Sequence, residues 1–497
     1  MDTAIEVYQP EHNIRVVTAT SLFDGHDVSI NIIRRMLQDT GVEVIHLGHN
    51  RSVRNIVNAA VQEDVQGIAV SSYQGGHLEF FKYMVDLLKD NGTSHIKVFG
   101  GGGGVIVPDE IRILEAYGVA KIYTPEDGTR MGLQGIINDM VKRMDFSTIS
   151  GDDPILKDLS IEETSRIANL ITVLEHGNAS ESSDLEELKL ELSRNIWDHK
   201  PAIIGITGTG GAGKSSLTDE LVLRFLNDFE SATVAILSCD PSRRKTGGAL
   251  LGDRIRMNAI DDPRVYMRSL ATRTSRTELP VGLSDISSVL GVAGFDLIII
   301  ETAGIGQGDS NIVNEADVAI YTMTSEFGAA SQLEKIDMLD YADIVVVNKF
   351  EKQGAEDALR DVRKQVQRNR KAFDTPLEAM PVFGTIASKF NDDGVTSLYH
   401  ALLDALRAKT GFAFDSRLPK PEGRASTSKT IIIPLERIPY LSDIADTVRD
   451  YHHHTQVQAD AVRNLWHLKK AADLINDQRH EATADDMRKA IADAEDA

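Results

Sequence analysis

Apolar runs alternate with amphipathic stretches along the first part of the chain. Short apolar runs bounded by turn residues predict strands at 14–20, 42–48, 66–72, 96–100 and 119–124. Between these runs, apolar residues recur every three or four positions, which predicts helices near 28–39, 51–63, 77–91, 108–117 and 127–144. Because alternating strands and helices form parallel sheets with helices on both faces, we expect a flavodoxin-like (Rossmann-like) α/β domain with strand order 2-1-3-4-5.

The alternation resumes after a polar joint and a helical stretch. Residues 155–200 predict two helices, and a second α/β series follows with strands at 202–207, 233–238, 295–302, 318–323, 343–349 and 380–385. A connector rich in proline, glycine and serine then leads to helices over 436–497. The pattern predicts an α/β domain at 1–148, a helical linker at 149–200, a second α/β domain at 201–412 and a connector with helices at 413–497.

Composition narrows the functional classes. The chain has 497 residues, enough for several domains, and a net charge of −22, which argues against a nucleic-acid partner. Neither an apolar stretch long enough for a transmembrane helix nor a signal-peptide pattern occurs, so we expect no membrane partner. The single cysteine, Cys239, excludes an internal disulfide and a cysteine-cluster metal site. We therefore expect a protein of the reducing cytoplasm.

A glycine-rich segment opens the second α/β series. It reads G-T-G-G-A-G-K-S and lies between a predicted strand and a predicted helix. The glycines allow backbone N–H groups to wrap phosphate oxygens, Lys214 neutralises phosphate charge and the Ser215 hydroxyl can ligate Mg²⁺. The predicted nucleotide-binding residues in this P-loop are Gly208, Gly210, Gly211, Ala212, Gly213, Lys214, Ser215 and Ser216.

Carboxylates follow two later strands of the same series. Glu301 ends the run DLIIIETAG, where its carboxylate can reach Mg²⁺ and Gly304 can meet the γ-phosphate. Asp240 ends the run LSCDP, and Asp253 follows in GALLGDRIRM. Both aspartates are candidates for the magnesium shell, with helix caps or surface charge as the alternative. We expect Lys214, Asp240 and Glu301 to be the catalytic residues.

The run VVVNKF indicates the identity of the base. Asn348 and Lys349 begin an N-K-x-D guanine-reading motif, and Glu351 stands where the motif has aspartate. A carboxylate that is one methylene longer can still accept hydrogen bonds from guanine, so GTP is favoured over ATP. The segment GTIASKFNDDG occupies the place of a guanine-capping loop, with Ala387 and Ser388 as candidate backbone contacts.

Two segments of the second α/β domain carry a family resemblance. DPSRRKTGGALLGDRIRM and ETAGIGQGDSN resemble the MeaB-type G-protein chaperones of cobalamin-dependent acyl-CoA mutases, and the resemblance spans about 200–410. It implies that Asp240, Asp253 and Glu301 lie near Mg²⁺. It also supports a homodimer formed through the C-terminal helices.

The turn after the first strand carries a second resemblance. From Asp24 to Ser29 it reads D-G-H-D-V-S and resembles the cobalamin-binding D-x-H-x-x-G motif, with Ser29 at the glycine position. The resemblance implies that a neutral His26 imidazole ligates cobalt from below, in place of the cofactor's own dimethylbenzimidazole. Asp24 would accept from the other ring nitrogen and orient the ring. Alone, the motif also fits a hydrogen-bonded surface histidine.

The other strand ends favour the cobalamin interpretation, because α/β sheets bind ligands at the carboxyl edge of their strands. The third strand ends in two serines, the fourth in a glycine run that leaves room for the nucleotide tail, and the fifth in Y-T-P. Tyr73 stands where the family has leucine. The predicted cobalamin-binding residues are Asp24, His26, Ser29, Ser71, Ser72, Gly100, Gly101, Gly102, Thr124 and Pro125.

The order of the two domains resembles the fused isobutyryl-CoA mutases over nearly the whole chain, through SLFDGHD, HLGHNRSV and AVSSYQGGH. In that family a (β/α)₈ barrel of about 250 residues or more binds acyl-CoA, and this sequence lacks it. The resemblance implies adenosylcobalamin, GTP/GDP and Mg²⁺ as cofactors, and the barrel (in cis or in trans) and an adenosyltransferase as partners. The implied activities are GTP hydrolysis and, with the barrel, interconversion of isobutyryl-CoA and n-butyryl-CoA.

Three alternatives fit parts of the pattern. A corrinoid methyl-transfer module coupled to a GTPase usually carries a helical cap before its cobalamin domain, and too few residues precede the first strand here. A separate small subunit of a related 2-hydroxyisobutyryl-CoA or methylmalonyl-CoA mutase has the same domains. A signalling GTPase with a receiver-like domain needs acidic strand ends, whereas the third strand ends in Ser71 and Ser72.

Overall fold

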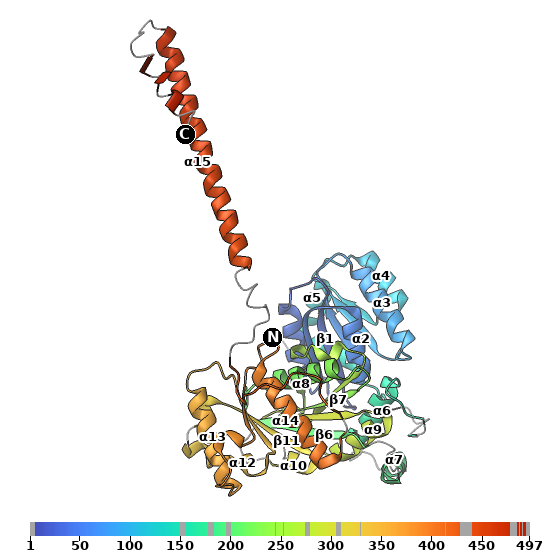
Figure 1. Cartoon of the computed structure of the whole chain (residues 1–497). Helices are drawn as coiled ribbons and strands as arrows, with labels where there is room; N and C mark the ends of the chain where they lie inside the picture. Colours follow the sequence, from blue (N-terminus) through green and yellow to red (C-terminus); the bar gives the residue numbers. More distant parts are fainter. Residues whose placement is uncertain are drawn as a thin grey trace. The chain divides into compact units, whose positions relative to one another are not determined.

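The computed structural model describes residues 5–149, 156, 158–176, 183–194, 200–243, 245–251, 253–273, 279–304, 310–328, 330–412, 414–427, 440–477, 485–486, 488–489 and 491–493. The chain divides into two compact units, Met1–Ser428 and Lys429–Ala497. The first unit contains two parallel β-sheets, and the second contains the long helix α15 (Tyr440–Asp477) (Figure 1).

The first sheet is built from the N-terminal strands, which are β1 (Arg15–Ser21), β2 (Glu43–Arg51), β3 (Gly67–Ser71), β4 (Lys97–Gly101) and β5 (Lys121–Tyr123). The helices that follow them are α1 (Val28–Asp39), α2 (Val53–Gln62), α3 (His77–Asp90), α4 (Pro108–Tyr117) and α5 (Pro125–Met144). The strands pair in parallel in the order β5-β4-β3-β1-β2, so the predicted flavodoxin-like order is confirmed. Val17 packs into the core on one face of the sheet and Val16 into the core on the other.

A sixth strand extends this sheet and comes from the second half of the chain. β8 (Ala249–Leu251) pairs in parallel with β2, with Glu43 opposite Ala249 and Ile45 opposite Leu251. The sequence did not predict this strand, because three residues are too few to display a period. Its pairing ties the chain after β7 to the N-terminal domain.

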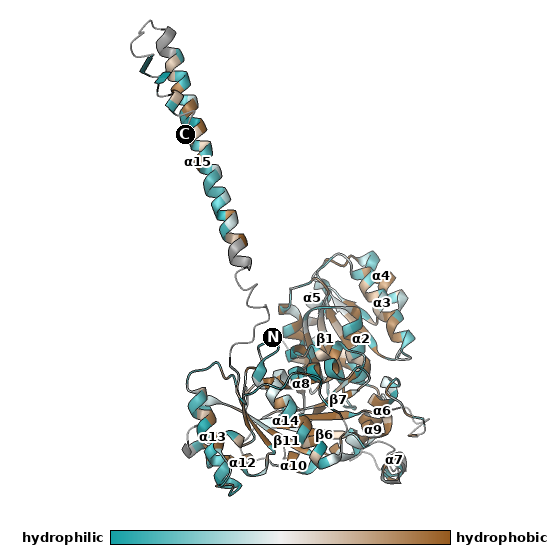
Figure 2. Ribbon diagram, in the orientation of Figure 1, coloured by the Kyte–Doolittle hydropathy of each residue, from teal (hydrophilic) through white to brown (hydrophobic). Residues whose placement is uncertain are grey.

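The second sheet contains β6 (Ala202–Gly208), β7 (Val234–Asp240), β9 (Val265–Ala271), β10 (Leu297–Thr302), β11 (Val318–Thr324), β12 (Ile344–Asn348) and β13 (Val382–Thr385). Its order is β13-β12-β11-β6-β10-β7-β9, and its strands are strongly hydrophobic (Figure 2). Helices of this part are α8 (Lys214–Asp228), α9 (Leu283–Ala293), α13 (Ala355–Asn369) and α14 (Asp393–Thr410). The sequence missed β9 because Arg268 interrupts its apolar run, although the structure buries this arginine completely.

The predicted linker contains two helices, α6 (Thr164–His176) and α7 (Ser183–Arg194). Their apolar side chains join the core that also contains residues of β6 and α9, and Ile167, Ile171 and Leu188 are fully buried there. The two helices are therefore an integral part of the second α/β layer and do not form a free spacer.

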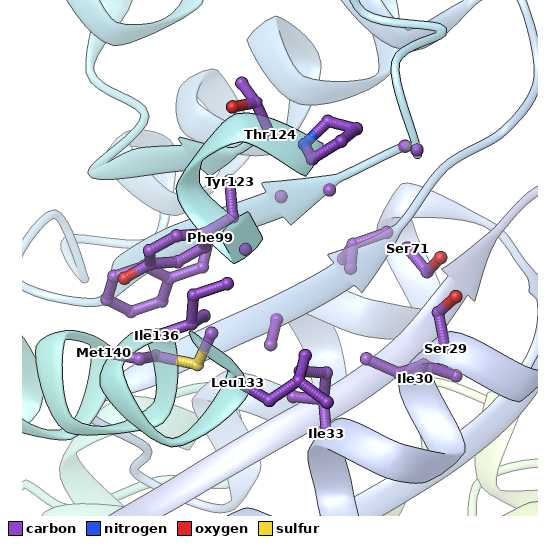
Figure 3. A pocket seen from close by; sticks show the side chains of 18 of the residues that line it. Ser29, Ile30, Ile33, Ser71, Phe99, Tyr123, Thr124, Leu133, Ile136 and Met140 are labelled. Atoms are coloured by element: carbon purple, nitrogen blue, oxygen red, sulfur yellow. The ribbon is translucent and has the colours of Figure 1, made fainter. Parts of the chain in front are cut away.

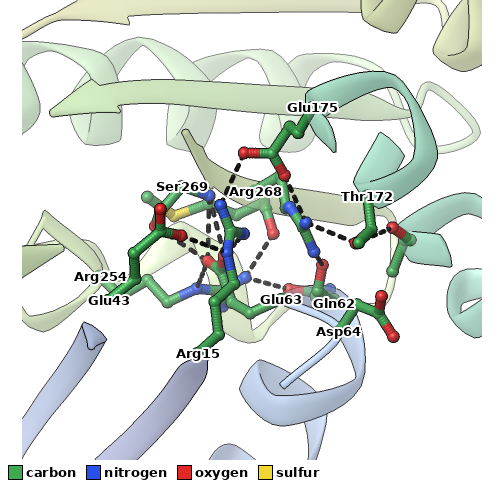
Figure 4. A network of polar contacts seen from close by, with 12 residues as sticks. Arg15, Glu43, Gln62, Glu63, Asp64, Thr172, Glu175, Arg254, Arg268 and Ser269 are labelled. Carbon is green, nitrogen blue, oxygen red and sulfur yellow. Dashed lines mark hydrogen bonds and ion pairs between the residues drawn. The ribbon is translucent and has the colours of Figure 1, made fainter. Parts of the chain in front are cut away.

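Buried charged residues join the first sheet, α6 and the second sheet (Figure 4). Glu175, near the end of α6, accepts hydrogen bonds from Arg15 at 2.7 Å and from Arg268 at 2.6 Å. Glu43 of β2 accepts from Arg15 and from Arg273, each at 2.8 Å. One arginine of β1 is thus shared by carboxylates from two separate parts of the chain.

Glu63, which follows α2, is the most deeply buried of these carboxylates. It accepts from Arg254 Nε at 2.8 Å and from the backbone N–H and hydroxyl of Ser269 at 3.0 and 2.9 Å. We call this set the junction network, and its charged members are Arg15, Glu43, Glu63, Glu175, Arg254, Arg268 and Arg273. Burial acts to raise the pKa of Glu175, but the neighbouring arginines outweigh burial and lower this pKa, so the carboxylate stays ionised at neutral pH.

Helix α15 makes up most of the described part of the second unit. Its apolar residues are scattered among polar ones, and Tyr451 and Trp466 are exposed. His452, His453 and His454 lie on it and are all exposed. Among the described residues, no helix combines the length and the apolar character needed to span a bilayer.

Replacing Glu175 by alanine tests the junction network. The Glu175→Ala variant should lose about 3–5 kcal/mol of stability, because buried arginines lose a carboxylate that compensates their charge. Urea or thermal unfolding of the full chain measures the loss. Glu162→Ala is the matched control, because Glu162 is an exposed glutamate just before α6 and should change stability by less than about 0.5 kcal/mol. Equal stability of the two variants would contradict the structural role of the network.

Candidate functional site

His26 lies on the turn between β1 and α1, where the buried carboxylate of Asp24 holds it. Asp24 accepts hydrogen bonds from the backbone N–H of His26 at 2.9 Å, from its Nδ1 at 2.8 Å and from the backbone N–H of Tyr73 at 2.6 Å. Burial would raise the pKa of Asp24, but these hydrogen bonds outweigh burial and lower it. The Asp24 carboxylate therefore stays ionised and fixes the imidazole through Nδ1.

The imidazole of His26 projects outward from this turn. Its side chain is 77% exposed, whereas that of Asp24 is 1% exposed. No described residue makes a hydrogen bond to its Nε2, so the nitrogen opposite the Asp24 contact is available to a ligand. A fixed ring with one free nitrogen is the geometry that a metal-ligating histidine needs.

A cavity of about 240 Å³ lies at the carboxyl edge of the first sheet, beside this turn. Figure 3 shows Ser29 and Ser71 at one end, and Phe99 and Tyr123 at the other. The predicted residues that line it are Ser29, Ser71, Gly100, Gly101, Gly102, Thr124 and Pro125. Ser72 does not line it, because its side chain is fully buried and accepts a hydrogen bond from Ser21 at 2.9 Å.

The glycine run has a different packing reason from the one predicted. A Cβ at Gly100 would lie 2.6 Å from Phe81 in the core, and a Cβ at Gly102 would collide with the backbone carbonyl of Ser72. At Gly101 a Cβ would meet only the carbonyl of Tyr123, at 3.6 Å. Close packing around the strand therefore requires glycine at positions 100 and 102. The cavity lies beside backbone that carries no side chains.

The two departures from the family motif contact each other. The hydroxyls of Ser29 and Tyr73 are 3.0 Å apart, and the Tyr73 ring centroid lies 5.3 Å from that of His26. A glycine at 29 could not make this hydrogen bond and neither could a leucine at 73. The paired substitutions explain why serine is accommodated at the expected glycine position.

The second site surrounds the P-loop between β6 and α8. A cavity of about 100 Å³ is lined by Gly211, Gly213, Lys214, Ser215, Ser216, Asp240, Arg256, Glu301, Thr302 and Ala303. Gly213 is the N-cap residue just before α8 and has φ +90°, a conformation that side-chain-bearing residues rarely adopt. Gly304 packs directly against the Lys214 side chain. The structure therefore brings the predicted P-loop, Asp240 and Glu301 to one pocket.

Glu301 is fixed by hydroxyl groups of α8. The Ser215 hydroxyl donates to Oε1 at 2.6 Å and the Thr218 hydroxyl lies 2.9 Å from Oε2. Glu301 is only 2% exposed, so its orientation is well defined. The sequence did not predict a role for Thr218. The side chain of Asp253 lies outside the described residues.

Asn348 connects the P-loop to the loop after β13. Its amide donates to the carbonyl of Ala212 at 2.8 Å, and its oxygen accepts from the backbone N–H of Ala387 at 3.1 Å. Lys349 has φ +57°, and Glu351 and Ser388 are exposed beside these groups in sequence. Asn348 therefore holds the two loops together, whereas Glu351 and Ser388 make no contact with a described residue that fixes their roles.

Comparisons with known proteins agree with this division. The family model "Methylmalonyl Co-A mutase-associated GTPase MeaB" matches residues 167–417, and "B12 binding domain" matches residues 14–132. The chain is 55% identical over 489 residues to the fused isobutyryl-CoA mutase of Geobacillus kaustophilus, with 98% of this chain and 44% of that protein covered. Its identity to the fused isobutyryl-CoA mutase of Cupriavidus metallidurans is 56% over 476 residues, covering 96% of this chain and 43% of that protein.

A shorter match comes from the methylmalonic aciduria type A homolog, mitochondrial, of Caenorhabditis briggsae. It is 29% identical over 215 residues, which are 41% of this chain and 52% of that protein. The chain spans less than half the length of the two fused mutases. The predicted resemblances are confirmed, and the matches support cobalamin and a guanine nucleotide as the ligands of the two sites. The chain belongs to the MeaB family of methylmalonyl-CoA mutase-associated GTPases and carries a B12-binding domain before its GTPase domain.

Proposed function

We propose that this chain binds adenosylcobalamin in its first domain and hydrolyses GTP in its second, as the cofactor-handling part of an isobutyryl-CoA mutase. The observation that carries the proposal is the exposed His26 ring, fixed by Asp24 at the edge of an open cavity, in the same compact unit as a P-loop pocket. The proposed domains are 1–148 for cobalamin, 149–200 for the helical linker, 201–412 for the GTPase and 413–497 for the connector and helices.

The cavity of the first sheet has the character that the lower base and nucleotide tail of cobalamin require. Its walls include the apolar side chains of Phe99, Ile136 and Met140, which suit an aromatic base. In this mode His26 Nε2 would ligate cobalt, while Asp24 holds the ring through Nδ1. When bound, adenosylcobalamin supplies homolysis of its cobalt–carbon bond, and the protein contributes orientation and protection. Ser29, Ser71, Gly101, Thr124 and Pro125 would complete the contacts.

The second pocket offers the groups that GTP hydrolysis needs. Lys214 would neutralise the phosphates, and the P-loop backbone would donate to their oxygens. The pocket's oxygen donors are the Ser215 hydroxyl and the Glu301 and Asp240 carboxylates, a donor set that suits Mg²⁺. Glu351 would accept hydrogen bonds from the guanine base. Asn348 would hold the surrounding loops in place through its hydrogen bonds to Ala212 and Ala387.

The mutase reaction and the partners are part of the same proposal. We propose that GTP hydrolysis governs cofactor loading, and that interconversion of isobutyryl-CoA and n-butyryl-CoA needs a substrate barrel, in cis or in trans. The similarity to fused isobutyryl-CoA mutases, of which this chain covers 44%, supports this assignment. An adenosyltransferase would supply the cofactor, the C-terminal helices would support a homodimer, and the protein would work in the cytoplasm.

The cobalt ligand is tested by titrating the full chain with adenosylcobalamin and recording visible spectra. The wild-type protein should shift the spectrum to that of a histidine-ligated cobalamin, and His26→Ala should abolish this shift. Asp24→Asn should weaken cobalamin binding by about 10–100-fold, because the His26 imidazole loses the carboxylate that orients it. His12→Ala is the matched control, since His12 is partly exposed and precedes β1 at the opposite end of the strand. If the His26→Ala variant gave the same spectrum as the wild-type protein, ligation of cobalt by His26 would be refuted.

The nucleotide assignment is tested by comparing turnover of GTP and ATP in the presence of Mg²⁺. GTP should be hydrolysed in preference to ATP, and Lys214→Ala should lower kcat by about 100-fold or more, because phosphate charge loses its cation. Lys364→Ala provides a control, because Lys364 lies on α13 and does not line the pocket. Glu351→Ala should reduce the preference for GTP. Equal use of both nucleotides by the wild-type chain would contradict guanine recognition.

The mutase role is tested by mixing the cobalamin-loaded chain with a separate acyl-CoA-binding barrel subunit. Isomerisation of isobutyryl-CoA to n-butyryl-CoA should require both proteins. Chromatography of the acyl-CoA products measures it. The His26→Ala chain serves as the negative control. Methyl transfer in place of isomerisation would favour the corrinoid methyl-transfer alternative.

A further inference from the structure

The nucleotide pocket contains a cation that the sequence motifs did not identify. Arg256, the last residue of the short 3-10 helix η1 (Asp253–Arg256), lines the same cavity as Lys214, Ser215 and Glu301. Its side chain is exposed, and no other described residue makes a hydrogen bond or an ion pair with its guanidinium. Most buried arginines nearby are committed to carboxylates, so Arg256 is distinctive in being available to an anion.

The charge of the pocket favours a phosphate as that anion. Lys214 is the other cation that lines it, and Asp240 and Glu301 contribute negative charge. A nucleoside triphosphate brings several further negative charges, which shift onto the β–γ bridging oxygen and the γ-phosphoryl oxygens during hydrolysis. A planar guanidinium can donate to two of these oxygens at once, which an ammonium group cannot do with the same geometry.

The first arginine of η1 points to the other domain. The Arg254 guanidinium is 3% exposed and donates to Glu63 at 2.8 Å and to the side chain of Gln62 at 2.7 Å, and it also contacts the carbonyl of Met267. Gln62 and Glu63 lie at the end of α2 in the cobalamin domain, and Figure 4 shows Arg254 within the junction network. One turn of 3-10 helix thus separates a buried anchor in the cobalamin domain from a free guanidinium in the nucleotide pocket.

Two further contacts hold η1 against the cobalamin domain. A Cβ at Gly48, in β2, would lie 2.5 Å from Ile255 Cδ1, so this isoleucine packs onto the bare backbone of the strand. Immediately before η1, β8 pairs with β2. The segment that carries Arg256 therefore contacts the first sheet as well as the P-loop domain.

We propose that Arg256 contacts the β- and γ-phosphates of GTP and stabilises the transition state of hydrolysis, and that the Arg254–Glu63 pair positions it. Arg256 is thus a catalytic residue, whereas Arg254 and Glu63 are positioning residues. GTP turnover consequently depends on the cobalamin domain through η1. This inference rests on the proposed GTPase function and adds to it a residue and a dependence on the neighbouring domain.

The step itself is ordinary phosphoryl transfer to water. The water oxygen forms a bond to the γ-phosphorus while the bond from that phosphorus to the β–γ bridging oxygen breaks, and its electron pair remains on GDP. One proton of the water ends on a phosphate oxygen, so the products are GDP and inorganic phosphate. Arg256 donates hydrogen bonds throughout and is not consumed.

Steady-state GTP hydrolysis by the full chain with Mg²⁺ tests the catalytic part. Arg256→Ala should lower kcat by about 100-fold or more with a much smaller change in KM, because the contact strengthens in the transition state. Arg256→Lys should remain well below wild type, since an ammonium group cannot replace the bidentate contact. Arg243→Ala is the matched control: Arg243 precedes β8, is 48% exposed and pairs with Asp39 of the cobalamin domain, but does not line the pocket. Its kcat should stay close to that of wild type.

The positioning part is tested with Glu63→Gln and Arg254→Lys. Both should lower kcat by about tenfold, with KM for GTP nearly unchanged, when assayed well below their own unfolding temperatures. A purely structural role would lower the unfolding temperature and leave kcat intact. Arg254→Lys keeps a charge opposite Glu63 and should retain more activity than Arg254→Met.

The outcomes separate this inference from the proposed function. If the wild-type chain does not hydrolyse GTP, the GTPase proposal fails, and this inference fails with it. If the wild-type and Arg256→Ala chains turn over GTP equally while Lys214→Ala is inactive, the GTPase proposal stands and the role of Arg256 is overturned. Full kcat in folded Glu63→Gln and Arg254→Lys would overturn the positioning role alone.

Discussion

The carboxylate of Glu63 is buried where the cobalamin domain meets the GTPase domain, and donors from both domains surround it. Its partners are Arg15 from the first sheet, and Arg254 and Ser269 from the second half of the chain. Separating the domains would require these buried groups either to lose their partners or to be rehydrated together, and breaking a buried ion pair on one side only is strongly unfavourable. This constraint explains why the two sheets and α6 belong to one compact unit.

That junction connects the two domains through short elements. β8 adds a strand to the cobalamin sheet, although in the sequence it lies in the segment that follows β7. The last residue of β7 is Asp240. η1 then returns the chain to the nucleotide pocket. The nucleotide pocket is therefore lined in part by a segment that directly follows a strand hydrogen-bonded to the cobalamin domain.

The cobalamin edge illustrates how side chains compensate for each other. Ser29 and Tyr73 each depart from the motif, and their hydroxyls hydrogen-bond at 3.0 Å. The Tyr73 backbone N–H also donates to Asp24, the residue that orients His26. The end of β3 thus supports the histidine turn after β1, and the pairing of β1 with β3 makes this contact possible.

Local sequence patterns determined much of this protein. The apolar period located the strands and the order of the first sheet, and the P-loop and the D-x-H turn located both sites, because each depends on residues close together in the chain. The pattern did not predict β9, because Arg268 interrupts its apolar run. In the structure Arg268 can be buried because it pairs with Glu175, which is distant in the sequence. β8, the junction network and the position of Arg256 were decided only by the tertiary structure. They depend on contacts between residues far apart in the sequence, such as Arg254 and Glu63, which meet only when the two sheets pack together. A local pattern of apolar and polar residues carries no information about such long-range contacts.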